Sequence, residues 1–417
     1  MTSPLNRRSA DSIVFFDSQN VNPVFFKIAI SLFALIALSD WWTFHEMRKK
    51  RINFFGYVLI FLPSLVCALH LILLLCGERS MYSFRIVSGT ILLFTVPKLV
   101  FTIISAGGNR LGRLFHRDWK HIQGVAFFFA CIVAVVQFYC VTVGISRLDV
   151  NRVTLASPLL PKSFDGYRVV QISDLHLGSY FSDDSFVRTV VDSVNSLHPD
   201  LIVFTGDLVN ESPDEVLPEF VNALSCMHAP DGVYSVLGNH DFCVYKGFPS
   251  EQEVRRATDK VVRLEQSMGW EVLRDEHRLL VRDGDTLVLA GTDNVAKPRP
   301  RREGEYVPPA GSLKKALRGV PNSHHVLLLT HDPWHWRREV TSDPRVLFTL
   351  AGHTHALHVR IGNFSPAAWI MPEWGGKYVS RNGMLYVSTG VGGSVKYRLG
   401  AWPAIELITL RRGHAME

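Results

Sequence analysis

Five short polar clusters in the second half of the chain carry most of the side chains that could do chemistry. In chain order they are Asp174-Leu175-His176, Gly206-Asp207, Gly238-Asn239-His240-Asp241, His331 and Gly352-His353-Thr354-His355. They supply carboxylates, a carboxamide and several imidazoles, the mixed oxygen and nitrogen ligands that first-row divalent metal ions accept. A carboxylate between two such ions can hold them about 3.5–4 Å apart, so that a bridging water loses a proton readily and attacks in line. The clusters therefore predict a two-metal hydrolase that acts on a phosphoester.

Each cluster has an ordinary structural explanation when it is considered alone. A Gly-Asp pair after a strand is usually a turn, and a single histidine is usually a hydrogen-bonded polar residue. His353 and His355 are more specific, because two imidazoles two residues apart can face one metal pocket. The occurrence of all five clusters in this order favours a metal site over scattered turn residues.

The elements that must position these clusters are predicted to be short strands that alternate with helices. Strands are expected at residues 167–172, 201–204, 233–237, 326–329, 346–350, 384–387 and 405–410, and helices at 183–197 and 218–225. This alternation predicts a largely parallel sheet with helices outside it. Each cluster follows an expected strand, and ligands of such sheets gather beyond the carboxyl ends of the strands. We therefore expect the five clusters to converge on one cleft.

The order Asp-x-His, Gly-Asp, Gly-Asn-His-Asp, His and Gly-His-x-His resembles the calcineurin-like metallophosphoesterase superfamily over about residues 165–410. The sequence Leu-Tyr-Val-Ser-Thr-Gly-Val-Gly at residues 385–392 also resembles its membrane-associated bacterial branch. That branch includes UDP-2,3-diacylglucosamine hydrolases of the lipid A pathway and secreted or membrane-tethered phosphodiesterases. The resemblance implies a four-layer α/β fold, with two mixed sheets flanked by helices and the site at the sheet edge.

The resemblance also implies a role for each polar residue. One metal ion would be held by Asp174, His176, Asp207 and His355, and the other by Asp207, Asn239, His331 and His353. Asp207 would then bridge the two ions, and the mixed ligands favour Mn, Fe or Zn. His240 is similar to the family's acid, which helps the departing oxygen to leave.

Two positions depart from the family pattern. Many members have an aspartate three residues after the Gly-Asp aspartate, where it steadies the catalytic histidine, but this chain has Asn210. An asparagine brings no negative charge and would stabilise a charged His240 less, so Asp241 could take that part instead. Close relatives read Gly-Gly-Gln after Gly-His-x-His, where this chain reads Ala-Leu-His at 356–358. The rim of the pocket is therefore expected to differ from theirs.

The first 145 residues have a different pattern, with four long apolar runs at about 23–39, 54–76, 86–105 and 125–143. A helix that crosses a bilayer needs roughly 20 mostly apolar residues. The alternative is four buried helices of a soluble protein, but four such runs in succession argue against it. A cleaved signal peptide is also excluded, because three further apolar runs follow the first. We predict an N-terminal tail (1–22), a membrane domain with four transmembrane helices (23–145), a linker (146–164) and a metallophosphoesterase domain (165–417).

Basic residues next to the spans indicate the orientation of the chain. The loops after the first and third runs are the most basic, which marks the cytoplasmic side and places the catalytic domain in the periplasm or outside the cell. Arg147 and Arg152, just after the last run, count against this orientation. Lys98, beside Pro97, is interpreted as a lysine of a kinked helix that extends toward the interface, since the other runs contain no carboxylate.

The net charge of +6 lies largely beside the spans, which favours contact with anionic lipid and not with nucleic acid. We therefore expect a lipid-linked or membrane-proximal phosphodiester, pyrophosphate or phosphomonoester as the substrate. The pocket rim is expected to include residues 356–358, the basic loop 299–302, Trp334 and Trp336. Of the cysteines, Cys226 and Cys243 could pair only if the fold brings them together.

Several other functions fit parts of the sequence. The chain could be a UDP-2,3-diacylglucosamine hydrolase of lipid A synthesis, or a general phosphodiesterase that is merely tethered to the membrane. A receptor or transporter that retains the fold would be signalled by a missing metal ligand, and no ligand is missing. A protein phosphatase would need an Asp-Arg pair where this chain has Asn210-Glu211, which argues against that activity.

Overall fold

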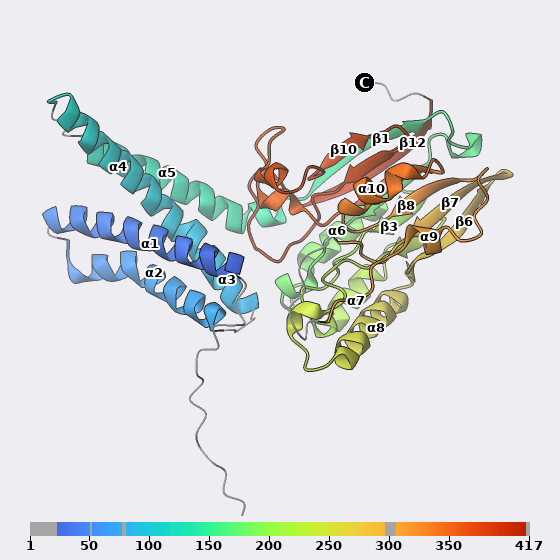
Figure 1. Cartoon of the computed structure of the whole chain (residues 1–417), viewed down its shortest axis with the longest axis horizontal. Coiled ribbons are helices and arrows are strands. Elements are labelled where there is room, and N and C mark those ends of the chain that lie inside the picture. The colour runs from blue at the N-terminus through green and yellow to red at the C-terminus, as the bar shows by residue number, and fades with distance from the viewer. Residues whose placement is uncertain are drawn as a thin grey trace, which may run out of the picture. The chain divides into compact units, whose positions relative to one another are not determined.

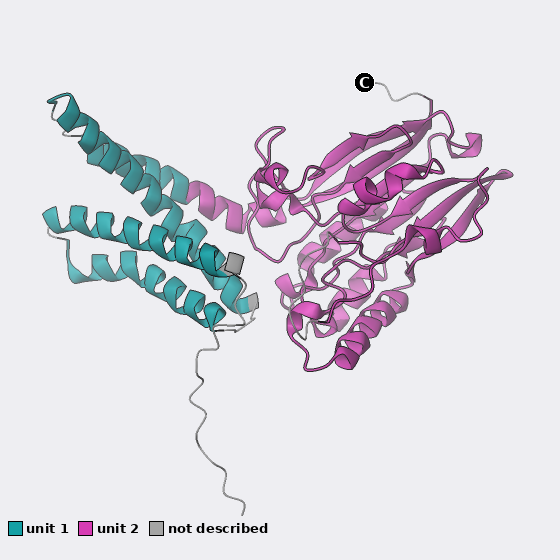
Figure 2. Cartoon of the chain, in the orientation of Figure 1, with its two compact units in different colours: residues 1–134 teal, residues 135–417 magenta. Residues whose placement is uncertain are grey.

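The structure is a computed structural model that describes residues 23–50, 52–76, 81–117, 119, 121–296 and 306–413. The expected N-terminal tail and the basic loop at 299–302 lie outside the described residues. The chain divides into two compact units, residues 1–134 and 135–417 (Figures 1 and 2).

The first unit is helical, as its apolar runs predict. Its helices are α1 (Pro23–Lys49), α2 (Phe54–Leu75), α3 (Met81–Thr90), the π-helical turn η1 (Ile91–Thr95), α4 (Val96–Leu114) and the first part of α5 (Ile122–Thr142). Four stretches are long and apolar enough to cross a membrane: Phe26–Lys49, Phe54–Leu75, Tyr82–Leu114 and Ile122–Ser146. The π-helical turn ends two residues before Pro97, which lacks the N–H and crowds the carbonyl one turn earlier. Stretches of this length and composition indicate a membrane protein.

The expectation for Lys98 was wrong. The Lys98 ammonium contacts the Asp40 carboxylate on α1 and the Ser64 hydroxyl on α2. Ser64 also donates to Asp40 at 3.1 Å. Asp40 comes directly after the first apolar run, but α1 continues to Lys49 and therefore carries a carboxylate to the level of Lys98. A paired ammonium avoids most of the cost of a lone charge among membrane helices.

The second unit contains two six-stranded mixed sheets (Figure 1). The first sheet has the order β1 (Asp149–Ser157), β12 (Ala404–Arg412), β2 (Arg168–Ile172), β3 (Leu201–Phe204), β4 (Val233–Ser235) and β5 (Glu271–Val272). The second has the order β10 (Gly376–Val379), β11 (Met384–Val387), β9 (Val346–Ala351), β8 (His325–Leu329), β7 (Asp285–Gly291) and β6 (Glu276–Arg282). Strands β2 to β5 run parallel, as do β7, β8, β9 and β11, whereas β12, β6 and β10 run antiparallel to a neighbour. The strand–helix pattern predicted one largely parallel sheet, and the structure divides it into two.

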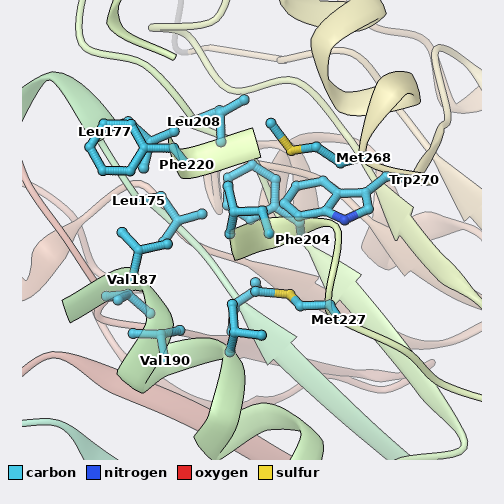
Figure 3. Packing of buried hydrophobic residues seen from close by; sticks show 14 of the residues in the cluster. Leu175, Leu177, Val187, Val190, Phe204, Leu208, Phe220, Met227, Met268 and Trp270 are labelled. Atoms are coloured by element: carbon cyan, nitrogen blue, oxygen red, sulfur yellow. The ribbon is translucent and has the colours of Figure 1, made fainter. Parts of the chain in front are cut away.

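Helices cover the outer face of each sheet. The first sheet packs against α6 (Ser185–Ser196), α7 (Pro218–Leu224) and α8 (Glu251–Ser267) through a cluster that includes Val190, Phe204, Phe220 and Trp270 (Figure 3). The second sheet packs against α9 (Leu313–Ala316) and α10 (Trp334–Arg338). The inner faces share a third cluster that includes Val169, Val203, Leu289, Phe348 and Ile408. The four-layer α/β fold with two mixed sheets is confirmed.

The segment expected as a linker is partly built into the first sheet. Residues 149–157 form β1, which pairs in parallel with β12 from Asp149 opposite Ala404 to Ser157 opposite Arg412. Among the expected helices, that at 183–197 begins at Ser185 and ends at Ser196. Cys226 is exposed and Cys243 is buried, and both thiols are free.

Candidate metal centre

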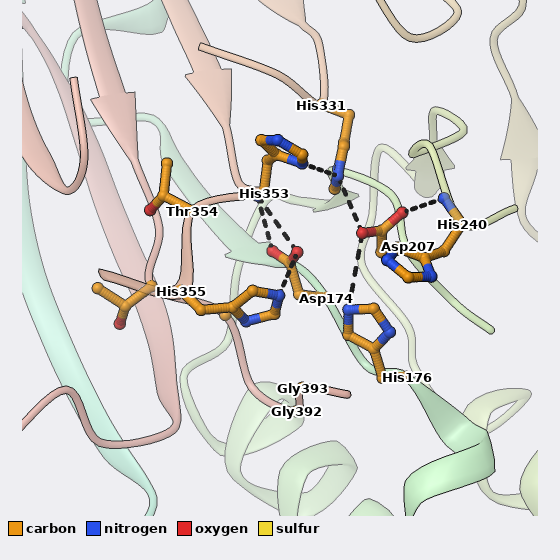
Figure 4. A network of polar contacts seen from close by, with 12 residues as sticks. Asp174, His176, Asp207, His240, His331, His353, Thr354, His355, Gly392 and Gly393 are labelled. Carbon is orange, nitrogen blue, oxygen red and sulfur yellow. Dashed lines mark hydrogen bonds and ion pairs between the residues drawn. The ribbon is translucent and has the colours of Figure 1, made fainter. Parts of the chain in front are cut away.

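All five polar clusters lie directly after strands, at one edge of the two sheets. Asp174 and His176 follow β2, Asp207 follows β3, Asn239 and His240 follow β4, His331 follows β8, and His353 and His355 follow β9. Figure 4 shows the side chains from both sheets turned toward one another. The parallel strands bring their carboxyl ends to the same edge, which explains the convergence.

Asp207 lies at the centre of this group and is 1% exposed. One carboxylate oxygen is 3.0 Å from His331 Nε2 and 3.6 Å from His176 Nε2. The other accepts the main-chain N–H of His240 at 2.9 Å. Although burial alone would raise it, the imidazoles of His331, His240 and His176 hold the pKa of Asp207 well below its usual range. The residue is therefore an anion that faces both halves of the site.

The remaining polar side chains form groups around Asp207. The ligand atoms of Asp174, His176 and His355 lie within 4.8 Å of one another, as do those of Asp207, His331 and His353, and those of His176, Asp207 and His240. In the first group, Asp174 Oδ1 is 3.3 Å from His355 Nε2. In the second, His331 Nε2 is 3.2 Å from His353 Nδ1. Buried carboxylates and imidazoles this close together fit a pair of divalent metal ions.

Two histidines are oriented by main-chain carbonyls. His331 Nδ1 donates to Thr205 O at 2.7 Å, which leaves Nε2 facing Asp207. His240 Nδ1 donates to Asn210 O at 2.5 Å, which leaves its Nε2 as the nitrogen able to exchange a proton. Burial lowers the pKa of His331, but the Asp207 carboxylate raises it to about 10. Burial and the neighbouring His240 lower the pKa of His176 to about 3, so this imidazole is neutral and suited to bind a metal.

Asn210 and Asp241 both contact the residues around the site, but through other groups than the sequence suggested. Asn210 binds His240 through its main-chain oxygen, and its side-chain amide donates instead to Ser179 Oγ at 3.1 Å. The substitution of asparagine for aspartate therefore leaves the hydrogen bond to His240 unaffected. The Asp241 carboxylate points to the main chain, where it accepts four N–H groups at 2.7–3.2 Å, those of Asp207, Leu208, Val209 and Gly238. Asp241 thus fixes the loops after β3 and β4 to each other.

Asn239 has a buried side-chain oxygen that accepts no hydrogen bond from the described residues. Its amide nitrogen donates to the hydroxyl of Tyr245 at 3.0 Å, and the Tyr245 ring lies 4.5 Å from that of His240. An amide oxygen left without a donor fits a metal ligand. Tyr245 was missed by sequence analysis, because an aromatic residue after a motif carries no signal of its own.

The backbone at the site adopts left-handed conformations. Five of the expected ligands, Asp174, His176, Asp207, His353 and His355, have φ angles between 48° and 74°. The left-handed run continues through Ala356, Leu357 and His358, with φ of 51°, 46° and 61°. Such conformations cost energy in residues other than glycine and are concentrated at functional sites. The ring of His358 stacks on that of His355 at 5.0 Å.

Glycines allow the loops to approach the ligands closely. A Cβ on Gly238 would lie 2.1 Å from Asp207 Oδ1, and a Cβ on Gly390 would lie 2.8 Å from Asp174 Cβ. The loop that contains Gly390 also donates from Gly392 N to Asp174 O at 2.7 Å. This loop, residues 389–393, therefore forms the wall of the site behind Asp174.

The wall is held by a buried arginine that sequence analysis did not identify. The Arg398 side chain is 2% exposed, and its guanidinium donates to the carbonyl oxygens of Thr389, Gly390, Gly392 and Ala401. Burial lowers the pKa of Arg398 to about 10, so it remains a cation. His335, by contrast, contacts Thr330 and Glu339 away from the metal-ligand groups, and Trp336 is part of the core.

Comparison with known proteins gives consistent results. Residues 167–357 match the family model described as calcineurin-like phosphoesterase. The chain is 29% identical to the uncharacterized metallophosphoesterase YkuE of Bacillus subtilis, over 63% of this chain and 86% of that protein. It is 29% identical to a transmembrane protein with metallophosphoesterase domain of Danio rerio, over 80% and 75%. It is 43% identical to the UDP-2,3-diacylglucosamine pyrophosphatase LpxG of Chlamydia trachomatis, but over only 22% and 29%.

Proposed function

We propose that the chain is a membrane-anchored two-metal enzyme that cleaves a lipid-linked or membrane-proximal phosphoester. The match of residues 167–357 to the calcineurin-like phosphoesterase family supports a metal-dependent phosphoester hydrolase. The observation that carries the two-metal part is the position of Asp207, an ionised and buried carboxylate with imidazoles on both sides. One carboxylate that serves both ligand groups is the arrangement expected for a bridged pair of ions.

The residues divide into two ligand sets that share Asp207. One ion would be held by Asp174, His176, Asp207 and His355, and the other by Asp207, Asn239, His331 and His353. When bound, the ions supply positive charge at the phosphoryl oxygens and an activated water. His240 keeps one nitrogen on Asn210 O and offers the other to the departing oxygen of the substrate, which it would protonate.

The membrane spans support a substrate at the bilayer. We propose that residues 23–145 form the membrane domain and that the catalytic domain, residues 165–417, works at the surface of the same membrane. An anchored site meets lipid-linked substrates at a high local concentration. The basic loops after the first and third spans support a periplasmic or extracellular position for the catalytic domain.

The similarity to LpxG favours a second candidate within the same chemistry. That protein is named as a UDP-2,3-diacylglucosamine pyrophosphatase, which would be a pyrophosphate hydrolase of an acylated sugar nucleotide. This candidate requires a site that receives such a substrate on the cytoplasmic side. Fusion of a reporter after Glu417 distinguishes the two orientations: alkaline phosphatase is active and green fluorescent protein is dark if the catalytic domain faces outward. The reverse result would favour the acylated sugar nucleotide.

Substitution of Asp207 tests the two-metal assignment. Full-length protein in nanodiscs is stripped of metal, reloaded with Mn²⁺ and assayed with bis(p-nitrophenyl) phosphate. Asp207→Asn should abolish turnover and lower the bound metal from two ions per chain, because it removes the charge that serves both ligand groups. Asp231→Asn is the matched control, since the Asp231 carboxylate binds Tyr167 Oη at 2.6 Å outside the ligand groups. Wild-type turnover in Asp207→Asn would refute the assignment.

A further inference from the structure

A segment next to the metal centre presents large apolar side chains to the surface. In Leu357–Ile370, which we call the apolar loop, the exposed fractions are 41% for Leu357, 67% for Ile361, 46% for Phe364, 78% for Trp369 and 62% for Ile370. Single exposed apolar residues are common on soluble proteins, but several large ones within 14 residues mark an interaction surface.

The apolar loop is fixed by its own polar groups. The hydroxyl of Ser365 is fully buried and donates to Ala356 O at 2.7 Å. Ile361 and Phe364 exchange main-chain hydrogen bonds of 2.8 and 3.1 Å, and the Phe364 and Trp369 rings lie 5.7 Å apart. The loop therefore buries the Ser365 hydroxyl while several of its large apolar side chains face outward.

The base of the apolar loop is bonded to a second segment, residues 398–402. Arg360 N donates to Leu399 O at 2.7 Å, and Leu399 N donates to His358 O at 2.9 Å. A Cβ on Gly400 would lie 1.9 Å from Arg360 O, so the two segments touch through their backbones. The apolar loop and residues 398–402 thus form one continuous surface.

This second segment is bonded in turn to the last turns of α5, within the same compact unit. Arg398 N donates to Cys140 O at 3.1 Å, and the ring of Trp402 packs against Tyr139 at 6.0 Å. The guanidinium of Arg147 lies 4.9 Å from the centre of the Trp402 ring. α5 belongs to the candidate membrane span Ile122–Ser146. The C-terminal end of this span therefore marks a bilayer surface, and the apolar loop lies beside it.

The residue types match what a lipid interface binds. Tryptophan is enriched at the level of lipid headgroups, where its ring is partly apolar and its N–H is polar. Arg147 and Arg360 can bind anionic headgroups around the apolar side chains. The surface also leads to the metal centre, since Leu357 is two residues from His355, a main-chain span of at most about 7 Å.

We propose that the apolar loop inserts into the interfacial region of the bilayer leaflet where α5 ends, and that its side chains receive the acyl part of a lipid-linked phosphoester bound at the metal centre. The first part concerns a lipid surface and stands independently of catalysis. The second part deepens the function proposed above and rests on it.

Site-specific crosslinking tests the insertion directly. The photoreactive amino acid p-benzoylphenylalanine replaces Trp369 in the full-length protein, reconstituted in nanodiscs of phosphatidylcholine and phosphatidylglycerol. The control places the same amino acid at Val281 on β6, which is 67% exposed. After irradiation, mass spectrometry should detect lipid adducts at position 369 and not at position 281. The absence of adducts at 369, or equal yields at both positions, would overturn the proposal.

A pair of double variants tests the effect on the substrate. Ile361→Ser with Trp369→Ser removes the most exposed apolar side chains of the loop, and Leu279→Ser with Val281→Ser removes two of similar exposure, 57% and 67%, from β6. The probes are CDP-diacylglycerol and phosphatidic acid in the nanodisc, and soluble bis(p-nitrophenyl) phosphate. For the loop variant, kcat/KM on the lipid probes should fall at least tenfold because KM rises, while hydrolysis of the soluble probe is unchanged. The β6 variant should match wild type on all probes.

The outcomes separate this inference from the proposed function. If the loop variant cleaves the lipid probes as well as wild type does, the apolar loop does not receive the substrate. If wild type cleaves only the soluble probe while position 369 still crosslinks to lipid, the insertion stands and the lipid-linked substrate is refuted. If wild type cleaves neither kind of probe with metal present, the proposed function itself fails.

Discussion

Arg398→Met removes the guanidinium that ties the wall of the metal centre together while it preserves much of the side-chain volume. Three carbonyl oxygens, those of Thr389, Gly392 and Ala401, then lose their donor, whereas Gly390 O keeps the N–H of Ala404 at 3.2 Å. The methionine cannot replace any of these hydrogen bonds. The loop at 389–393 is expected to loosen, and Asp174, against which Gly390 packs, should lose its fixed position.

The magnitude follows from the number of groups left unpaired. A buried acceptor without a donor costs about 1 kcal/mol at the lower end of the measured range, so three acceptors cost about 3 kcal/mol. A domain of this size loses about 2–4 °C of melting temperature for each kcal/mol. The apparent Tm should therefore fall by about 6–12 °C. Arg398→Lys should recover only part of this loss, since one ammonium cannot reach acceptors spread along the loop.

Scanning fluorimetry of the full-length protein in detergent measures the apparent Tm. Mn²⁺-dependent hydrolysis of bis(p-nitrophenyl) phosphate measures the catalytic activity of the metal centre. The matched control is Arg360→Met, an exposed arginine whose Nε donates to Gly362 O. The control should lower the Tm by about 1 °C or less. If Arg398→Met melts within about 2 °C of wild type, the guanidinium does not hold the wall and the reasoning fails.

Three further predictions concern single residues. His240→Ala should retain both metal ions, as measured by elemental analysis, and lower kcat by about 10²- to 10⁴-fold. Asn210→Asp should leave kcat within a factor of about three, because His240 binds the main-chain oxygen of residue 210. A large effect of Asn210→Asp would contradict that hydrogen bond. Glu265 is buried, and desolvation raises its pKa well above 4.5. Above pH 4.5 the folded state therefore keeps a proton that the unfolded state releases, and the stability of the fold falls as the pH rises. Glu265→Gln should flatten the decline of Tm between pH 5 and 8, and parallel Tm curves would exclude this explanation. Leu357 has a left-handed φ of 46°, which costs a residue with a Cβ about 1 kcal/mol but costs glycine nothing. Leu357→Gly should therefore raise the Tm by about 2–4 °C. An unchanged or lower Tm would show that this backbone carries no strain.

The sequence predicted the positions of the polar clusters well because their signal is local. The strands before them are continuous apolar runs, and β3 at Leu201–Phe204 and β11 at Met384–Val387 have the predicted bounds. Edge strands gave no such signal. β5 has two residues, and β6 exposes apolar Leu279 and Val281 while it buries Leu280, so neither has the continuous apolar pattern of a buried strand.

The helix α8 was missed although a local signal was present. Ser250 caps its first turn by accepting from Glu253 N at 3.2 Å, and a serine three residues before a glutamate is a known start signal. Two other features could not be predicted from the order of residues along the chain. The partner of Lys98 is Asp40, 58 residues away, and the group that binds His240 is a main-chain oxygen, which every residue type has.

Residues 135–142 of α5 are in the same compact unit as the catalytic sheets, and Arg398, which holds the wall of the metal centre, is hydrogen-bonded to Cys140 in that helix. The end of a candidate membrane span and the metal centre are thus parts of one compact unit. With the lipid-linked substrate proposed above, an enzyme held in this way would search for its substrate by lateral diffusion in two dimensions. Its rate should therefore follow the mole fraction of substrate in the bilayer, and dilution with inert lipid should slow it at constant bulk concentration.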